Sequence, residues 1–121
     1  MNRWIVVGAV SMAVGVALGA FGAHALRDSL TAKELDWWRT AQEYQVWHAL
    51  GLVLLGLLES SGRRLTVVGW LFVVGTLVFS GTLYAMALGG PTWLGAVTPI
   101  GGASFIAGWV VLAALSARKN G

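Results

Sequence analysis

The chain has 121 residues, of which 57% are hydrophobic and 11% are charged, and its formal net charge is +3. A soluble domain carries about 25% charged residues, so this composition argues against an ordinary soluble protein and favours an integral membrane protein. The absence of cysteine excludes disulfides and thiolate chemistry, and the eight scattered lysines and arginines form no basic stripe for a nucleic-acid partner.

The first apolar segment, residues 4–26, contains no Lys, Arg, Asp or Glu. About 20 apolar residues in a helix cross the hydrocarbon layer, so this segment is the first predicted membrane span. The Ala-His-Ala triplet at residues 23–25 also resembles the cleavage site of a secretory signal peptide. Because the apolar segment is longer than the roughly 7–15 residues of a signal core, we interpret it as a retained span.

The second span is predicted over residues 41–58 and is preceded by an interfacial helix over residues 31–40. Uninterrupted apolar sequence covers only residues 46–58, which is too short to cross alone. Thr31 and Glu34 have the spacing of a capping box, which predicts that the helix begins there. Aromatic anchors at the membrane boundary are expected at Trp37, Trp38, Tyr44 and Trp47.

Residues 66–88 form the third predicted span, and the Gly-Gly-Pro sequence that follows is a signal for a helix end. The fourth span covers residues 99–117, with Thr98 as the expected N-cap and Pro99 at the first helical position. Together the four spans predict an all-α fold, an integral membrane four-helix bundle in which residues 1–121 form one domain.

The positions of lysine and arginine predict the orientation, because short cytoplasmic loops are enriched in these residues. Four spans place five of them on one side of the membrane and three on the other. The five are Arg3, Arg63, Arg64, Arg118 and Lys119, and the three are Arg27, Lys33 and Arg39. We therefore expect both termini in the cytoplasm.

Small residues recur at steps of four in two of the predicted spans. The first span carries Ser11, Gly15, Gly19 and Ala23, and the third span carries Gly81 and Ala85. Residues four apart share a helix face, and small residues let two helix backbones approach closely in lipid. These stripes predict helix-packing contacts, either within the bundle or between copies of the chain.

The two histidines, His24 and His48, each begin a His-Ala-Leu triplet. Gln45 and His48 share a helix face, and His24 ends the first span on the side where the second span begins. We predict a polar cluster near one membrane face formed by His24, Glu43, Gln45 and His48, with His48 about 10 Å deeper than His24. Its members satisfy one another where helices meet, or they form a pocket for protons or a ligand. Metal binding by two histidines and a glutamate is a third alternative, which no ligand spacing supports.

Motifs of common enzyme classes are absent from the sequence. It contains no G-x-S-x-G nucleophile motif and no phosphate-loop or dinucleotide signature, and its five acidic residues suggest no paired-carboxylate site. We therefore predict a non-enzymatic protein without cofactor or metal that acts through interactions, as an accessory or assembly protein. Its expected partners are the lipid bilayer and either itself or a larger membrane complex. The alternative is a small oligomeric transporter or channel with a polar face around Gln45 and His48.

Several stretches along the chain resemble the YgdD-like family of small membrane proteins. They are GAFGAHAL (19–26), TAQEYQVWHALGL (40–52), SGTLYAMAL (80–88) and TPIGGASFIAGW (98–109). The resemblance covers nearly the whole chain and implies a four-span protein of the bacterial inner membrane. The family has a eukaryotic four-span relative and no known activity, so the resemblance supplies no function. It places His24, Gln45 and His48 within family motifs.

Overall fold

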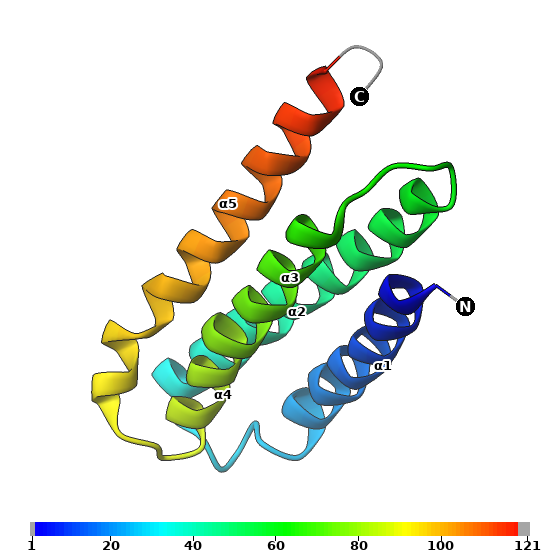
Figure 1. The fold of residues 1–121 in the computed structure, drawn as a ribbon. Helices are drawn as coiled ribbons and strands as arrows, with labels where there is room; N and C mark the ends of the chain where they lie inside the picture. The colour runs from blue at the N-terminus through cyan, green and yellow to red at the C-terminus, as the bar shows by residue number, and fades with distance from the viewer. Residues whose placement is uncertain (1, 119–121) are drawn as a thin grey trace.

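The computed structural model describes residues 2–118, and the regular structure of this part is entirely helical (Figure 1). Its helices form four rods, two of which are built from consecutive helices. The elements are α1 (Arg3–His24), α2 (Ala32–Glu59), α3 (Thr66–Gly75), η1 (Thr76–Ser80), α4 (Gly81–Ala87), η2 (Thr92–Ala96) and α5 (Thr98–Ala117). The third rod is α3–η1–α4 and the fourth is η2–α5. This architecture confirms the predicted all-α four-helix bundle.

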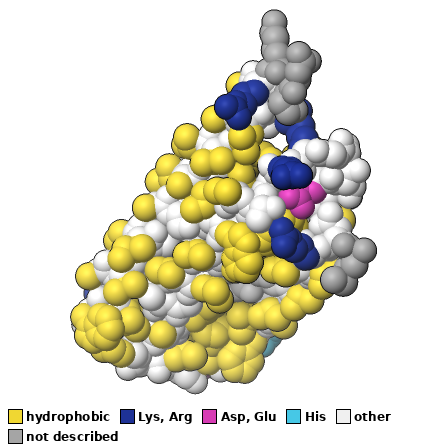
Figure 2. All heavy atoms as spheres, viewed as in Figure 1, with side chains coloured by type: hydrophobic (Ala, Val, Ile, Leu, Met, Phe, Trp, Pro, Cys, Tyr) yellow, Lys and Arg dark blue, Asp and Glu magenta, His cyan; other side chains and the backbone are white. Residues whose placement is uncertain are grey.

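Three of the rods in the described part are long and apolar enough to cross a membrane, namely Arg3–His24, Thr66–Ala87 and Thr92–Ala117. Their outward faces carry large apolar side chains such as Leu77, which is 69% exposed. Figure 2 shows apolar side chains over most of the visible surface, with Lys and Arg gathered at the end where α5 finishes. A surface of this kind faces lipid, because a soluble monomer rarely exposes such large apolar areas.

α2 is a single helix of 28 residues, so the predicted interfacial segment and second span are one element. Thr31 caps its first turn as predicted: the Glu34 backbone N–H donates to Thr31 Oγ1 at 3.1 Å, and the Thr31 N–H donates to Glu34 Oε1 at 2.9 Å. Both bonds of the capping box are therefore formed. The polar first half and the apolar second half of α2 both lie alongside the other rods (Figure 1).

The predicted N-cap of the fourth span was wrong. Val97 is the N-cap of α5, and Thr98 is already the first helical residue. The Thr98 hydroxyl donates back to the carbonyl of Leu94 at 3.1 Å and lies 2.6 Å from the hydroxyl of Thr82. The physical reason is that η2 leads directly into α5, so a carbonyl of the preceding turn is within reach of this side chain. Pro99, which was predicted at the first helical position, is accordingly the second residue of α5 and still lies in its first turn.

The third rod contains a π-helical segment, η1, that no sequence feature predicted. A π turn is wider than an α turn and usually occurs as a single bulge inside an α-helix. α5 approaches η1 closely: a Cβ on Gly101 would collide with the backbone of Phe79. Ser80, at the end of η1, donates its hydroxyl to the Ala41 carbonyl of α2 at 2.7 Å. The segment is therefore packed on both sides.

α2 occupies the centre of the bundle, while α1 and α5 lie on opposite sides of it (Figure 1). α1 packs mainly against α2, and α5 packs mainly against α3 and η1. One buried apolar cluster joins all four rods through Trp4, Leu52, Leu55, Leu65, Val68, Phe72 and Phe105. A second cluster, between α2 and α4, contains Ala41, Leu83 and Met86. The polar residues in the middle of α2 lie among these contacts.

Candidate functional site

Gln45 connects three rods from the middle of α2, where only 6% of its surface is exposed. Its Nε2 donates to the carbonyl oxygen of Ser11 on α1 at 3.0 Å. Its Oε1 accepts a hydrogen bond from the Tyr84 hydroxyl of α4 at 2.7 Å. Both ends of the amide are thus satisfied by neighbouring helices.

His48 lies one turn further along α2 and is 4% exposed. Its Nδ1 is 2.8 Å from the carbonyl oxygen of Tyr44, and its Nε2 is 3.0 Å from the indole Nε1 of Trp109 on α5. A carbonyl oxygen only accepts and an indole N–H only donates, so Nδ1 carries the proton and Nε2 is the acceptor. The imidazole is therefore neutral and held in one tautomer.

Aromatic rings surround this imidazole. Phe105 stacks on it with ring centroids 3.6 Å apart and an interplanar angle of 12°, and Phe72 meets it edge to face at 5.2 Å. We call Gln45 and His48 together with their inter-rod partners Ser11, Tyr84 and Trp109 the polar network. Among buried side-chain nitrogen and oxygen atoms of residues 2–118, only Trp4 Nε1 has no hydrogen-bond partner. The polar network is therefore closed, with no buried side-chain donor or acceptor left free.

Further hydrogen bonds join the rods around this network. Trp38 Nε1 donates to the Leu18 carbonyl at 2.9 Å, and Gln42 Nε2 donates to the Gly15 carbonyl at 3.3 Å. On the opposite side, the Ser104 hydroxyl of α5 reaches a carbonyl of α3 at 2.7 Å. Side-chain bonds of this type hold helices together in lipid, where hydrophobic association between spans is weak.

Of the predicted four-residue cluster, Gln45 and His48 lie one turn apart on α2 and bond to different partners, while His24 and Glu43 lie outside the polar network. His24 is exposed at the last residue of α1. α1 and α2 are antiparallel, with Gly8 against the backbone between Ala49 and Val53, so His24 lies level with the first turn of α2, about 20 Å from His48 along the axis. The expected depth of 10 Å is corrected because α1 runs alongside α2 from its first turn. Glu43 is half-buried and takes no part in the bonds of the network.

No three histidine or acidic side chains converge on a possible metal position within residues 2–118. His24 and His48, two members of the metal set that the sequence suggested, are separated by most of the length of α1. His48 also has both ring nitrogens engaged. The described side chains therefore present no ligand set for a metal ion.

The face of α1 that meets α2 differs in part from the predicted stripe. Gly15 is buried, Ser11 and Gly19 are half-buried, and Ala23 is exposed. Steps of four rotate by about 40° each on an α-helix, so Ala23 is turned by about 120° from Ser11. The buried glycines of α1 instead recur at steps of seven, which keeps them facing α2, and they are Gly8, Gly15 and Gly22.

The small residues predicted in the third rod lie on the surface of the single chain. Gly81 and Ala85 are both exposed on α4. A Cβ added to Gly81 would meet nothing within 4 Å. These two residues therefore pack against no other rod of the same chain, and a contact between copies stays a prediction.

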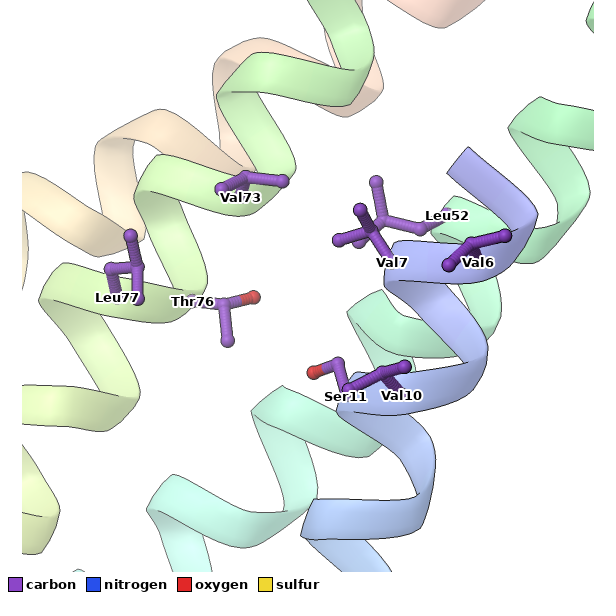
Figure 3. A pocket seen from close by; sticks show the side chains of 8 residues that line it. All are labelled: Val6, Val7, Val10, Ser11, Leu52, Val73, Thr76 and Leu77. Atoms are coloured by element: carbon purple, nitrogen blue, oxygen red, sulfur yellow. The ribbon is translucent and has the colours of Figure 1, made fainter. Parts of the chain in front are cut away.

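A groove opens sideways between α1 and the third rod (Figure 3). It encloses about 320 Å³ and has Leu52 of α2 among its lining residues. The hydroxyl of Thr76 in its wall donates to the Phe72 carbonyl at 2.9 Å. The remaining lining is Val6, Val7, Val10 and Ser11 from α1 and Val73 and Leu77 from the third rod. The groove is thus almost wholly apolar and opens on the lipid-facing side of the bundle.

Sequence reasoning missed Tyr84, Ser80 and Trp109, which complete the bonds between rods. Each is a polar or amphipathic residue inside an otherwise apolar span, and such a residue normally needs a partner. That signal marks them as candidates for buried contacts. The same signal does not identify their hydrogen-bond partners. These partners are 39 residues away in sequence for Tyr84 and Ser80 and 61 residues away for Trp109.

Residues 18–102 match the family described as "Protein of unknown function (DUF423)". The chain belongs to this family. A UPF0382 membrane protein of Staphylococcus epidermidis is 44% identical to it over 113 residues, which cover 93% of each chain. The UPF0382 membrane protein YwdK of Bacillus subtilis is 39% identical over 115 residues, covering 93% of this chain and 94% of YwdK.

The UPF0382 inner membrane protein YgdD of Escherichia coli is 40% identical to this DUF423 chain over 114 residues, covering 89% of the chain and 84% of YgdD. The resemblance to the YgdD-like family is therefore confirmed. No solved structure is detectably similar to the chain. The names of these DUF423 relatives state a membrane location and no enzymatic activity. The chain is thus a membrane protein from a family of unknown function.

Proposed function

We propose that this chain is a non-enzymatic inner-membrane protein that acts as an accessory or assembly protein by binding a transmembrane helix of a partner. The observation that carries the proposal is the apolar groove between α1 and the third rod, which opens sideways on the bundle (Figure 3). The partner helix belongs to a second copy of the chain or to a larger membrane complex. The Escherichia coli relative is named as an inner membrane protein, which supports the same membrane for this chain.

The closed polar network supports a structural role for the polar residues of α2. General acid–base chemistry needs a group that can exchange a proton with a substrate, whereas both ring nitrogens of His48 are bonded inside the chain. The alternative, an oligomeric transporter or channel along Gln45 and His48, would require this network to open. The groove requires no such rearrangement to accept apolar side chains.

The walls of the groove suit a helical partner. Val10 on α1 is 59% exposed and Leu77 on the third rod is similarly exposed, so both project from the rods toward the bilayer. Association of spans in lipid depends on close van der Waals packing, and a groove between two ridges provides it. The apolar side chains of one helix face would fill the space above Leu52.

The expected orientation, with both termini in the cytoplasm, is part of the same proposal. Asn2 Nδ2 donates to the Gly56 carbonyl at 2.8 Å, and Arg63 donates to the Ser116 hydroxyl at 3.3 Å. These bonds support one common end for the start of α1, the α2–α3 loop and the end of α5. That end carries the larger group of lysines and arginines, which favours the cytoplasmic side.

Site-specific photocrosslinking in intact cells tests the partner. A photoreactive phenylalanine analogue at Val10 should yield a protein adduct of defined mass. The same analogue at Ile106, which is 66% exposed on the outer face of α5, is the matched control and should yield little. Mass spectrometry then identifies the captured span. Equal adducts at both positions, or lipid adducts alone at Val10, would contradict a partner helix in the groove.

A further inference from the structure

A second hollow lies at the end of the bundle where the larger group of basic residues gathers. It encloses about 360 Å³ between the α2–α3 loop and the end of α5. Its lining residues, which we call the basic pocket, are Gly62, Arg63, Arg64, Leu65, Leu115 and Arg118. In Figure 2 the Lys and Arg side chains of this face gather at the same end. The basic pocket is separate from the groove and shares no residue with it.

The basic pocket has an excess of positive charge that the neighbouring Glu59 neutralises only in part. Arg63, Arg64 and Arg118 line it, and no acidic residue does. Glu59 is the acidic residue on this side of the bundle, and its Oε2 accepts a hydrogen bond from the backbone N–H of Leu65 at 2.9 Å. Three guanidinium groups around one hollow repel one another, so an anion between them would lower the electrostatic energy.

The donor groups suit a phosphate. A guanidinium group presents several N–H donors in a fixed plane and binds phosphate oxygens in pairs. Arg63 is already oriented by its bond to Ser116 Oγ, and this bond uses only one of its donors. Phosphate is therefore a better fit to the basic pocket than a simple halide.

The apolar part of the lining identifies the source of that phosphate. Leu65 is buried and Leu115 is half-buried, and both stand beside the three arginines. α3 and α5, which flank the hollow, are parts of the rods that are apolar enough to cross the membrane. The hollow therefore lies at the boundary of the hydrocarbon layer, where lipid phosphates are found, and basic pockets between spans bind such headgroups.

We infer that the basic pocket binds the phosphate of an anionic phospholipid, with Arg63, Arg64 and Arg118 around the headgroup and Leu65 and Leu115 against the start of its acyl chains. This inference is independent of the partner helix proposed for the groove, because the two hollows lie on different parts of the bundle. A bound lipid would bridge the α2–α3 loop and the end of α5 through contacts with both.

Lipid titration of the full chain in neutral detergent tests the inference. Phosphatidylglycerol is added stepwise, and the lipid-bound fraction is measured by native mass spectrometry. The triple variant R63Q/R64Q/R118Q should bind phosphatidylglycerol about 100-fold more weakly, because each of the three basic residues near a lipid headgroup contributes about fivefold to affinity. Phosphatidylcholine, which has no net charge, should bind the unchanged chain at least tenfold more weakly than phosphatidylglycerol does.

The matched control removes three positive charges from the opposite end, as R27Q/K33Q/R39Q. This variant should keep phosphatidylglycerol affinity within about threefold of the unchanged chain. An equal loss in both triple variants would overturn the inference, because the attraction would then depend only on net charge. Displacement of the lipid by millimolar inorganic phosphate would also overturn it, by indicating a site for the free anion.

The single variant R118Q keeps the test decisive if the triple variant does not fold. Arg118 follows the last residue of α5, so its replacement leaves the helical contacts intact. It should weaken phosphatidylglycerol binding about fivefold with an unchanged circular dichroism spectrum. Unchanged affinity in R118Q would remove Arg118 from the site and overturn the assignment.

Discussion

His48 shows how an ionisable side chain can be kept inside a membrane bundle without charge. Its Nδ1–H donates to the Tyr44 carbonyl, and its Nε2 lone pair accepts a hydrogen bond from the Trp109 indole. A second proton, on Nε2, would point at the indole N–H of Trp109 and would place a positively charged imidazolium against the ring of Phe105. The neighbours of His48 thus stabilise one neutral form. At the scale of the residue, His48 therefore contributes a hydrogen bond that holds α2 against α5.

The bond between His48 and Trp109 predicts coupled effects on stability. Trp109→Phe leaves the His48 Nε2 acceptor without its partner, and His48→Phe leaves the indole donor without its own. The double variant removes both unsatisfied groups, so the three changes in unfolding free energy should not be additive. We expect a coupling of about 0.6 to 1.7 kcal/mol, which are the average and the maximum found for hydrogen bonds between membrane helices. Reversible unfolding in mixed micelles measures it.

His24 provides the comparison that the repeated His-Ala-Leu triplet suggests. His24→Ala and His48→Ala should have additive effects within about 0.5 kcal/mol, because the two side chains are far apart and share no partner. Strong coupling between the two histidines, or additivity between His48 and Trp109, would contradict the placement of His48 in the network.

At the scale of the element, local signals predicted more than long-range ones. The capping box at Thr31 and the Gly-Gly-Pro end of the third rod depend on residues close in sequence, and both were correctly predicted. The side of α1 that meets α2 depends on the rotation of the helix, which has 3.6 residues per turn. Residues chosen at a fixed step of four therefore turn progressively away from α2. The π segment η1 carries no sequence signal that we can identify.

The candidate site was predicted in part for the same reason. The polarity of Gln45 and His48 within α2 marked them as a pair, and the structure gives each of them a hydrogen bond to a neighbouring rod. Their partners Tyr84 and Trp109 come from other rods, and the sequence does not contain the register between rods. His24 was misplaced because its distance from His48 depends on that register.

The close contact between α1 and α2 predicts that replacing a glycine within it lowers stability, whereas replacing an exposed glycine does not. A Cβ on Gly8 would lie 2.7 Å from the Ala49 carbonyl oxygen and 2.9 Å from the Val53 backbone nitrogen, and backbone atoms cannot rotate away. Gly8→Ala should therefore lower the free energy of unfolding by about 1–3 kcal/mol. Thermal unfolding in the same detergent measures the effect.

Gly81→Ala is the matched control for this replacement. A Cβ at residue 81 meets nothing within 4 Å, and alanine favours helix by up to about 1 kcal/mol over glycine. Stability should be unchanged or slightly higher. A clear loss in Gly81→Ala together with dissociation of an oligomer would instead place α4 at a contact between copies. Tolerance of Gly8→Ala would contradict the close approach of α1 to α2.

At the scale of the whole molecule, the charges and the fold agree on two distinct ends. Arg3 donates to the Thr66 hydroxyl at 3.1 Å, which places the start of α1 beside the start of α3. Arg63 and Arg118 both line the basic pocket at that end. Lys119, which belongs to the same predicted group, lies outside the described residues. Arg27, Lys33 and Arg39 lie near the opposite end, around the end of α1 and the first half of α2.

This division predicts that both termini are cytoplasmic, because five basic residues on one side outweigh three on the other. A reporter that is active only outside the cytoplasm should stay silent when fused after Gly121, and it should be active when inserted after Pro91, between α4 and η2. The variant R63Q/R64Q leaves three basic residues on each side. We expect it to insert in both orientations, with activity rising at Gly121 and falling at Pro91. Strong activity of the unchanged chain at Gly121 would reverse the assignment and place the basic pocket on the outer face.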